Sequence, residues 1–322
     1  MSWAERLQGV LVALAALAGI AVGLATDVGD MGEYLVLPCL VAMLAAVFVQ
    51  MDPSYVGQVR DAKPVVVASL VLNFVVTPLM AWALGAWLLA DQPDLRIGLL
   101  LLLVTPCTDW YLVFTAMARG HTGVAAALLP VNLVLQLALL PMYVLLLGGK
   151  SAAIEPTAFV ESVLLVLVVP LAAAVVLRAL ARRLPDPARG TQRLTDAAAF
   201  AVMPLLLLAV AGMLAWQAQE VADNAGVFWK LLAPLAIFFV LAPLLASMTA
   251  GLLRAPGPER VALVMTTTAR NSPIALAIAV AAFPERPLIA VALVIGPLVE
   301  LPVLAVLAQI VRLRSRAKHE TA

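Results

Sequence analysis

The sequence predicts an all-α polytopic membrane protein that forms one transmembrane domain over residues 1–322. Composition supports this prediction, because 64% of the residues are hydrophobic and only 12% are charged. Soluble domains carry about 25% charged residues, which solvate their surfaces. In addition, apolar runs of about 20 residues, the length that crosses a bilayer, recur along the whole chain. The net charge of +1 offers no basic face for nucleic acid.

Apolar windows between clusters of proline, glycine and charge predict ten transmembrane helices. Because their connections are short, the distribution of Lys and Arg indicates orientation. Fifteen of the 20 basic residues fall on one side of this layout and four on the other, while Arg270 lies inside a span. We therefore expect both termini in the cytoplasm. The expected spans cover residues 7–26, 34–51, 64–90, 97–118, 122–148, 156–180, 196–217, 227–253, 260–282 and 287–311.

The third and eighth spans share a pattern that indicates an internal repeat. The segment 73-NFVVTPLMAWALGAWLL-89 aligns with 238-FFVLAPLLASMTAGLLR-254 at an offset of 165. The second and seventh spans align through a proline in each, at an offset of 166. Two halves of five spans, about residues 1–150 and 151–322, would have opposite orientations, as inverted-repeat transporters do. The alternative is that Pro and Leu recur by chance in apolar helices.

The fourth and ninth spans each carry a helix breaker and polar residues at their centre. The segment 100-LLLLVTPCTDWYLVF-114 contains Thr105–Pro106, and 263-LVMTTTARNSPIALAIA-279 contains Ser272–Pro273. A hydroxyl residue before proline is typical of an N-cap followed by the first helical position, so each pair predicts that a helix restarts there. Broken helices survive in membranes where they line a cavity or lie inside protein. Two breaks from opposite directions near mid-depth predict one shared polar site.

Four residues at the breaks are candidates for binding a solute: Cys107, Thr108, Asn271 and Ser272. A lone cysteine in an apolar helix is usually a small hydrophobe, which is the alternative reading of Cys107. At a half-helix N-terminus, however, the positive end of the helix favours the thiolate. Thiolate is a soft ligand and suits a thiophilic solute.

Three ionisable residues, Asp109, Arg270 and Glu300, lie inside predicted spans. Such a group costs about 2.5–3.5 kcal/mol on insertion scales, so a functional role in ion coupling is the first interpretation. The alternative is a static ion pair between Arg270 and either carboxylate. Glu300 aligns with Gln136 at an offset of 164. A carboxyl group carries a proton and an amide does not, which assigns proton coupling to Glu300.

Three segments resemble a known family. TPCTDWYLVFTAMARG (105–120) resembles the fourth-span motif of the arsenite permeases, which belong to the bile acid:sodium symporter superfamily. ARNSPIALAIA (269–279) resembles the ninth-span crossover motif of that superfamily, and GPLVELPVL (296–304) resembles the tenth-span glutamate motif of the permeases. The pattern is similar to that of a bacterial subgroup usually called arsenic resistance proteins.

The resemblance implies that the fourth and ninth spans are broken and cross at the midplane. It also implies a mobile panel of spans 1, 2, 6 and 7 against a core of spans 3–5 and 8–10. The arsenite-binding cysteine of the family maps onto Cys107, so that As(III) would be bound there as transported solute. The coupling carboxylate maps onto Glu300. Further candidates at or near these motifs are Thr105, Pro106, Thr115, Gln136 and Pro273.

From this resemblance we expect a secondary active transporter that exports arsenite, and antimonite as a second solute, in exchange for protons by alternating access. Its partners would be the solute, protons and the lipid bilayer of a bacterial inner membrane. We expect no enzymatic activity, no cofactor and no nucleic-acid partner.

Two other functions remain open. One is a sodium-coupled importer of an organic anion, as in the bile-acid branch. Leu112 and Val113, which follow the fourth-span break, offer no side-chain oxygen to sodium. The other is an intramembrane enzyme or sensor that uses Cys107 and Asp109 as a thiol–carboxylate pair. No histidine lies within a predicted span centre to serve as its base.

Overall fold

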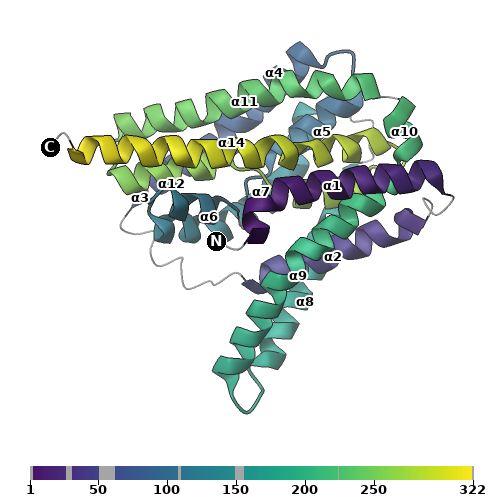
Figure 1. The fold of residues 1–322 in the computed structure, drawn as a ribbon, viewed down its shortest axis with the longest axis horizontal. Helices are drawn as coiled ribbons and strands as arrows, with labels where there is room; N and C mark the ends of the chain where they lie inside the picture. Colours follow the sequence, from purple (N-terminus) through teal and green to yellow (C-terminus); the bar gives the residue numbers. More distant parts are fainter. Residues whose placement is uncertain are drawn as a thin grey trace. The chain divides into compact units, whose positions relative to one another are not determined.

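The computed structural model describes residues 3–26, 31–50, 62–107, 110–148, 156–223 and 225–320 (Figure 1). These residues are helical apart from short connections and one isolated antiparallel β-bridge. The chain divides into two compact units. The first unit comprises Met1–Met51, Ala153–Phe228 and Pro273–Ile295, and the second comprises Asp52–Ala152, Trp229–Ser272 and Gly296–Ala322.

The first unit is built on a helical hairpin, α8 and α9, which lie side by side in Figure 1. Helix α9 begins at Pro187, whose fixed φ suits the first helical position. The Asp186 side chain caps it by accepting a hydrogen bond of 3.0 Å from the backbone N–H of Arg189. The helices of this unit are α1 (Trp3–Ala25), α2 (Met31–Gln50), α8 (Pro156–Ala181), α9 (Pro187–Trp216), α10 (Ala218–Asp223) and most of α13 (Ser272–Ala282).

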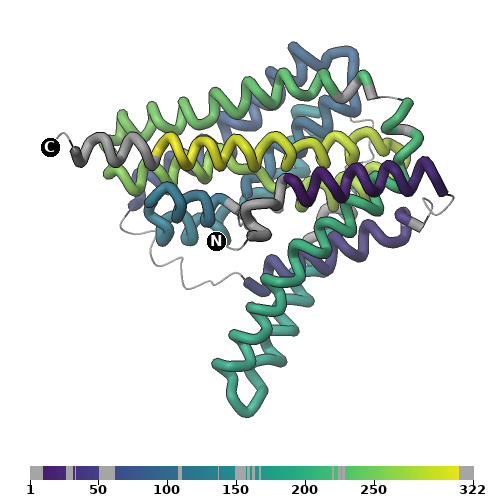
Figure 2. Tube along the Cα trace, in the orientation of Figure 1, coloured from purple at the N-terminus to yellow at the C-terminus, as the bar shows by residue number. Residues whose placement is uncertain are grey.

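Helix α1 packs on α9, and Figure 2 shows the path of both helices. Glycines of α1 bring the two backbones together. A Cβ at Gly19 would overlap the carbonyl oxygen of Ala211, and one at Gly23 would overlap that of Ala215. Gly19 and Gly23 form a G-x-x-x-G pattern, the small-residue interface that membrane helices use for close packing. Helices α1 and α9 are therefore held by close van der Waals contact between their backbones.

The second unit packs its helices around two hydrophobic clusters. One cluster joins α6, α7, α12 and α14, and the other joins α3, α7, α11 and α12. The helices of this unit are α3 (Lys63–Val71), the π-helical turn η3 (Leu72–Val76), α4 (Thr77–Leu88), α5 (Pro93–Val104), α6 (Trp110–Met117), α7 (Thr122–Leu147), α11 (Ala225–Leu252), α12 (Gly257–Thr268) and α14 (Pro287–Glu320), the last from Gly296 on.

Within the described residues, five helices are long and apolar enough to cross a membrane: Lys63–Leu88, Leu164–Ala181, Pro187–Trp216, Trp229–Leu252 and Pro287–Val311. Helix α7 adds a sixth if its two parts, which meet at a bend of 52°, form one span. Pro141 explains the bend, because it cannot donate to the carbonyl of Leu137 and its ring crowds that group. The fold is thus all-helical with five or six candidate spans, and the ten-helix inverted repeat stays a prediction.

Candidate functional site

The first break lies between α5 and α6. Helix α5 ends at Val104, Thr105 is extended with φ −103° and ψ 95°, and α6 begins at Trp110. The prediction that Thr105 caps a new helix with Pro106 as its first residue is therefore wrong. Proline disfavours the helical conformation of the residue before it, so Thr105 turns extended. Its hydroxyl donates back to the carbonyl of Leu101 at 2.9 Å and thus ends α5.

The second break lies between α12 and α13. Helix α12 ends at Thr268, and Ala269 is extended with φ −75° and ψ 139°. The next helix begins at Ser272 and has Pro273 as its second residue. The sequence therefore placed this helix start to within one residue, with Ser272 as the first helical residue rather than the N-cap. The hydroxyl of Ser272 is buried and has no hydrogen-bond partner among the described residues.

The two extended segments pair with each other as the antiparallel β-bridge between Pro106 and Arg270. The backbone N–H of Cys107 donates to the carbonyl of Ala269 at 3.2 Å, and the N–H of Asn271 donates to the carbonyl of Thr105 at 2.7 Å. The pairing satisfies backbone groups that the breaks release, which would be costly to bury unpaired.

The bridge has a local two-fold pattern. An offset of 164 relates the donor Cys107 to the donor Asn271, and it likewise relates the acceptor Thr105 to the acceptor Ala269. The two hydrogen bonds are therefore counterparts. Cys107 and Asn271 occupy equivalent positions on the two strands of the bridge.

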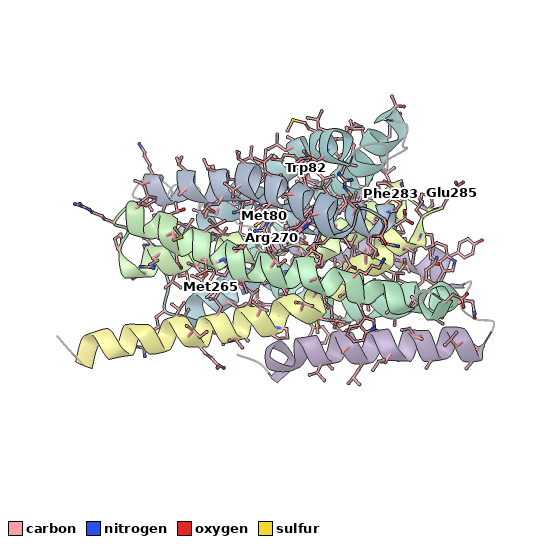
Figure 3. All side chains as sticks on the ribbon, turned by 90° about the horizontal axis from the view of Figure 1, so that it is seen from above. Met80, Trp82, Met265, Arg270, Phe283 and Glu285 are labelled. Carbon is pink, nitrogen blue, oxygen red and sulfur yellow. The ribbon has the colours of Figure 1, made fainter. Side chains whose placement is uncertain are left out.

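The guanidinium of Arg270 is buried, with 1% of the residue exposed, and Figure 3 shows it among the packed side chains. Its Nη1 donates to the carbonyl of Leu103 at 2.8 Å, and its Nη2 donates to Oδ1 of Asn73 at 2.6 Å and to the carbonyl of Thr267. The ring of Phe238 lies 5.3 Å from the guanidinium carbon, a cation–π contact. Arg270 thus ties the ends of α5 and α12 to η3 and α11.

Asn73 extends this contact into a buried polar chain. Its Nδ2 donates to Oγ of Ser69 at 3.2 Å, and that oxygen lies 3.2 Å from the Oγ1 of Thr266. Asn73 lies in η3, and π-helical turns are frequent at functional sites. The sequence reasoning missed Asn73 and Phe238 as site residues. The available signal was that both open the segments that align at an offset of 165.

Glu300 of α14 reaches the second break. The backbone N–H of Arg270 donates to its Oε1 at 2.8 Å, and the carboxylate is 3% exposed. One turn earlier, a Cβ at Gly296 would lie 2.7 Å from Oγ of Ser272 and 2.8 Å from Leu102 Cδ1. Only a residue without a side chain lets α14 approach the break this closely. The structure therefore brings Arg270, Ser272 and Glu300 together.

Cys107 is buried against both breaks. It packs in a hydrophobic cluster with Tyr111 of α6, Leu129 of α7 and Ala269, and its backbone N–H donates to the carbonyl of Ala269, the residue before Arg270. The other cysteine, Cys39, is also buried, but in α2 of the first unit. Within the described ranges, no group of three or more His, Cys, Asp and Glu side chains could hold a metal ion. Among the described residues, Cys107 is thus the one thiol at the break, and it shares its cluster with the thioether of Met265.

The remaining candidates divide into three cases. Thr115 is buried at the end of α6, where its carbonyl accepts the backbone N–H of Gly120 at 2.8 Å. Gln136 is buried in α7, and its amide has no hydrogen-bond partner in the part of the chain that the structure describes. Thr108 and Asp109 lie outside the described residues, so their roles remain predictions.

Comparison with known proteins adds the family context. Residues 37–224 match the Sodium Bile acid symporter family. The chain is 30% identical over 240 residues to the "Arsenical-resistance protein Acr3" of Corynebacterium glutamicum. The match covers 70% of this chain and 64% of the relative, so the chain spans less than two thirds of that relative's length. It is 25% identical over 227 residues to the uncharacterized protein YbaS of Bacillus subtilis, covering 69% of this chain and 71% of that relative.

Proposed function

Because the chain belongs to the Sodium Bile acid symporter family, we propose that it is a secondary transporter that exports arsenite in exchange for protons. Family membership makes it a multi-pass membrane transporter and not an enzyme. The likeness to a protein named for arsenical resistance supports arsenite as the solute. One observation carries the proposal: two paired helix breaks bring together a buried thiol, Cys107, and a buried carboxylate, Glu300, near the same arginine.

The chemistry of the solute matches the first of these groups. Arsenite is present near neutral pH as As(OH)3, a neutral molecule with a soft arsenic atom that prefers thiolate ligands. Cys107 would bind arsenic, and Asn271, Ser272 and Thr108 would bind its hydroxyl groups. Support comes from the buried Ser272 hydroxyl, which has no hydrogen-bond partner among the described residues. Antimonite has the same chemistry and would share the route.

The second group, the carboxyl group of Glu300, suits coupling to protons. Membrane potential exerts no force on a neutral solute, so uphill export needs another source of free energy. Proton influx supplies it if a carboxyl group binds a proton from outside and releases it inside. Glu300 would carry the proton, and Arg270 would hold the break in place beside it. Asp109, which lies outside the described residues, would assist them.

Alternating access completes the proposal. Spans 1, 2, 6 and 7 would move against spans 3–5 and 8–10, as one rigid group rocks past another in inverted-repeat transporters. The protein would lie in a bacterial inner membrane with both termini in the cytoplasm.

A second candidate follows from the family description itself, namely a sodium-coupled importer of an organic anion. In that case the guanidinium of Arg270 and the half-helix N-termini would bind a carboxylate or sulfonate. The guanidinium is only partly available for such an anion, because its terminal nitrogens donate to Leu103, Asn73 and Thr267, whereas its buried Nε has no partner among the described residues.

Everted membrane vesicles separate these two functions. We expect arsenite to accumulate in vesicles that are acidic inside, and accumulation to stop when a protonophore removes the pH gradient. Sodium should have no effect on this uptake. Accumulation of an organic anion that requires sodium, without arsenite uptake, would support the importer instead.

A further inference from the structure

Helix α7 carries two buried carboxamides that the mechanism above does not use. Asn132 and Gln136 are one helical turn apart, and each is at most 1% exposed. The oxygen and nitrogen of both side chains have no hydrogen-bond partner among the described residues. Buried amides are almost always hydrogen-bonded, because leaving them unpaired costs free energy. Four such atoms in adjacent turns of one helix need an explanation.

Their place on α7 points toward the breaks. Ala125, Leu129, Asn132 and Gln136 follow one another at spacings of four, three and four residues, which form one stripe on a helix. Ala125 and Leu129 pack in the same hydrophobic cluster as Cys107. The face of α7 that packs in the cluster of Cys107 therefore continues into the two amides.

The two-fold pattern of the bridge explains why Gln136 has no backbone partner. The offset of 164 that relates Pro106 to Arg270 also relates Gln136 to Glu300. Glu300 accepts a hydrogen bond from the backbone N–H of Arg270. The equivalent residue, Pro106, has no N–H to donate. The amide of Gln136 therefore cannot accept the backbone hydrogen bond that Glu300 accepts.

The same offset relates Asn132 to Gly296. At Gly296 the Oγ of Ser272 leaves no room for a Cβ, whereas α7 carries a full carboxamide at the equivalent place. Helix α7 then bends by 52° directly after Gln136, and Pro141 leaves the carbonyl of Leu137 without its helical donor. The first half of the chain thus gathers neutral polar groups where the second half has a glycine and a carboxylate.

We propose that Asn132 and Gln136 form a neutral hydrogen-bonding subsite for the hydroxyl groups of the transported solute, beside Cys107. The inference rests on the proposed function and deepens it. A carboxamide both donates and accepts, and so does each hydroxyl of As(OH)3. A sodium ion would use only the oxygens and leave the NH2 groups buried without acceptors.

The test measures arsenite transport by Gln136→Leu and Asn132→Leu in everted vesicles. Each variant replaces the amide with an apolar side chain that neither forms hydrogen bonds nor offers a soft donor to arsenic. We expect KM for As(OH)3 to rise about fivefold or more, the size of one lost net hydrogen bond, while the maximal rate stays within about twofold. The rise should be smaller for CH3As(OH)2, which has one hydroxyl fewer. Gln50→Leu is the matched control, because the Gln50 amide bonds to Ala46 of its own helix.

Stability provides the second measurement, since an apolar side chain in place of an unpartnered amide should not destabilise the fold. We expect Tm in detergent to be equal or higher for both variants, and stabilisation by added As(III) to shrink. Unchanged KM and unchanged As(III) stabilisation would overturn the inference, and so would a stabilisation by Na⁺ that the variants lose. If the parent protein itself transports no arsenite, the proposed function fails as well, which is a separate outcome.

Discussion

The backbone N–H of Arg270 donates a hydrogen bond of 2.8 Å to Oε1 of Glu300, while the guanidinium of the same residue bonds to other groups. Backbone and side chain of Arg270 thus have different tasks. A carboxyl group retains an acceptor oxygen after it binds a proton, so this hydrogen bond can exist in both protonation states. It is stronger to the carboxylate than to the neutral acid. Glu300 can therefore change its charge without losing its place at the break.

The first prediction concerns Glu300→Gln. The amide oxygen can still accept from Arg270, so we expect a folded protein with a Tm near that of the parent. Because the amide carries no proton, accumulation of arsenite against its gradient should fall to background in everted vesicles. The exposed Glu161 of α8 supplies the control Glu161→Gln, which should accumulate arsenite normally. Normal accumulation by Glu300→Gln would refute the proton-carrier role.

The second prediction concerns Cys107→Ala. Loss of the thiol should weaken As(III) binding about tenfold or more, because thiolate is a soft ligand and no other cysteine lies at the paired breaks within the described residues. KM for arsenite in vesicles and As(III)-dependent Tm shifts both measure it. Cys39→Ala is the matched control, since that buried thiol belongs to α2. Equal arsenite affinity in the two variants would show that the solute does not need the thiol.

The third prediction concerns Arg270→Met. It leaves the carbonyls of Leu103 and Thr267 and the Oδ1 of Asn73 without their donor. Each buried acceptor left unpaired costs about 1–3 kcal/mol, so we expect a loss of about 3 kcal/mol or more in unfolding free energy. Thermal unfolding in detergent measures it. Arg182→Met, at an exposed turn, should stay within about 0.5 kcal/mol of the parent. A stable Arg270→Met protein would contradict the bracing role.

The fourth prediction concerns Gly296→Ala. The new methyl group would meet Ser272 Oγ at 2.7 Å and Leu102 Cδ1 at 2.8 Å, so either these two side chains or α14 must move. We expect a loss of about 1–3 kcal/mol in stability, typical of overpacking, together with reduced transport. Gly251→Ala is the control, because a Cβ there meets nothing within 4 Å and alanine favours the helix by up to about 1 kcal/mol. Equal stability of both variants would rule out the close approach.

The fifth prediction concerns pH. A hydrogen bond of 2.5 Å from Lys230 Nζ lowers the pKa of Asp91 from its ordinary value of 3.8. Since the folded pKa lies below the unfolded one, the stabilisation is present above pH 3.8 and is lost as pH falls through the lower folded value. Both side chains are well exposed, so the effect should be small and sensitive to salt. The Tm difference between the parent and Lys230→Met should shrink below that pH, and a difference that grows would contradict the assignment.

Much of the helix layout could be predicted because its causes are local. Each predicted apolar window contains a helix or a pair of half-helices, although α9 begins at Pro187 instead of near residue 196. Both interruptions were predicted from proline and polar residues at the centres of apolar runs. The role of Thr105 was predicted wrongly, because the same residue pair can end one helix or begin the next. Which of the two occurs depends on the strand that Thr105 pairs with.

The proximity of several candidate residues was predicted, whereas their roles remain predictions. Cys107, Arg270, Asn271, Ser272 and Glu300 do gather around the bridge. Most partners of the Arg270 guanidinium were not predicted, because all of them except Thr267 lie more than 30 residues away in sequence, on η3, α5 and α11. A hydrogen bond between residues so far apart in sequence produces no periodic pattern in the sequence that would predict it.

By itself the sequence determined the membrane class, the positions of the breaks and the residue types available there, since hydropathy and the missing N–H of proline act on the chain locally. Only the tertiary structure decided that the breaks pair at Pro106 and Arg270, and that Arg270 offers its backbone to Glu300 and its guanidinium to Leu103 and Asn73. The physical reason is that hydrogen bonds are short and directional. A donor bonds to the acceptor that the packing of the helices brings within about 3 Å of it. The sequence pattern along the chain does not contain that distance.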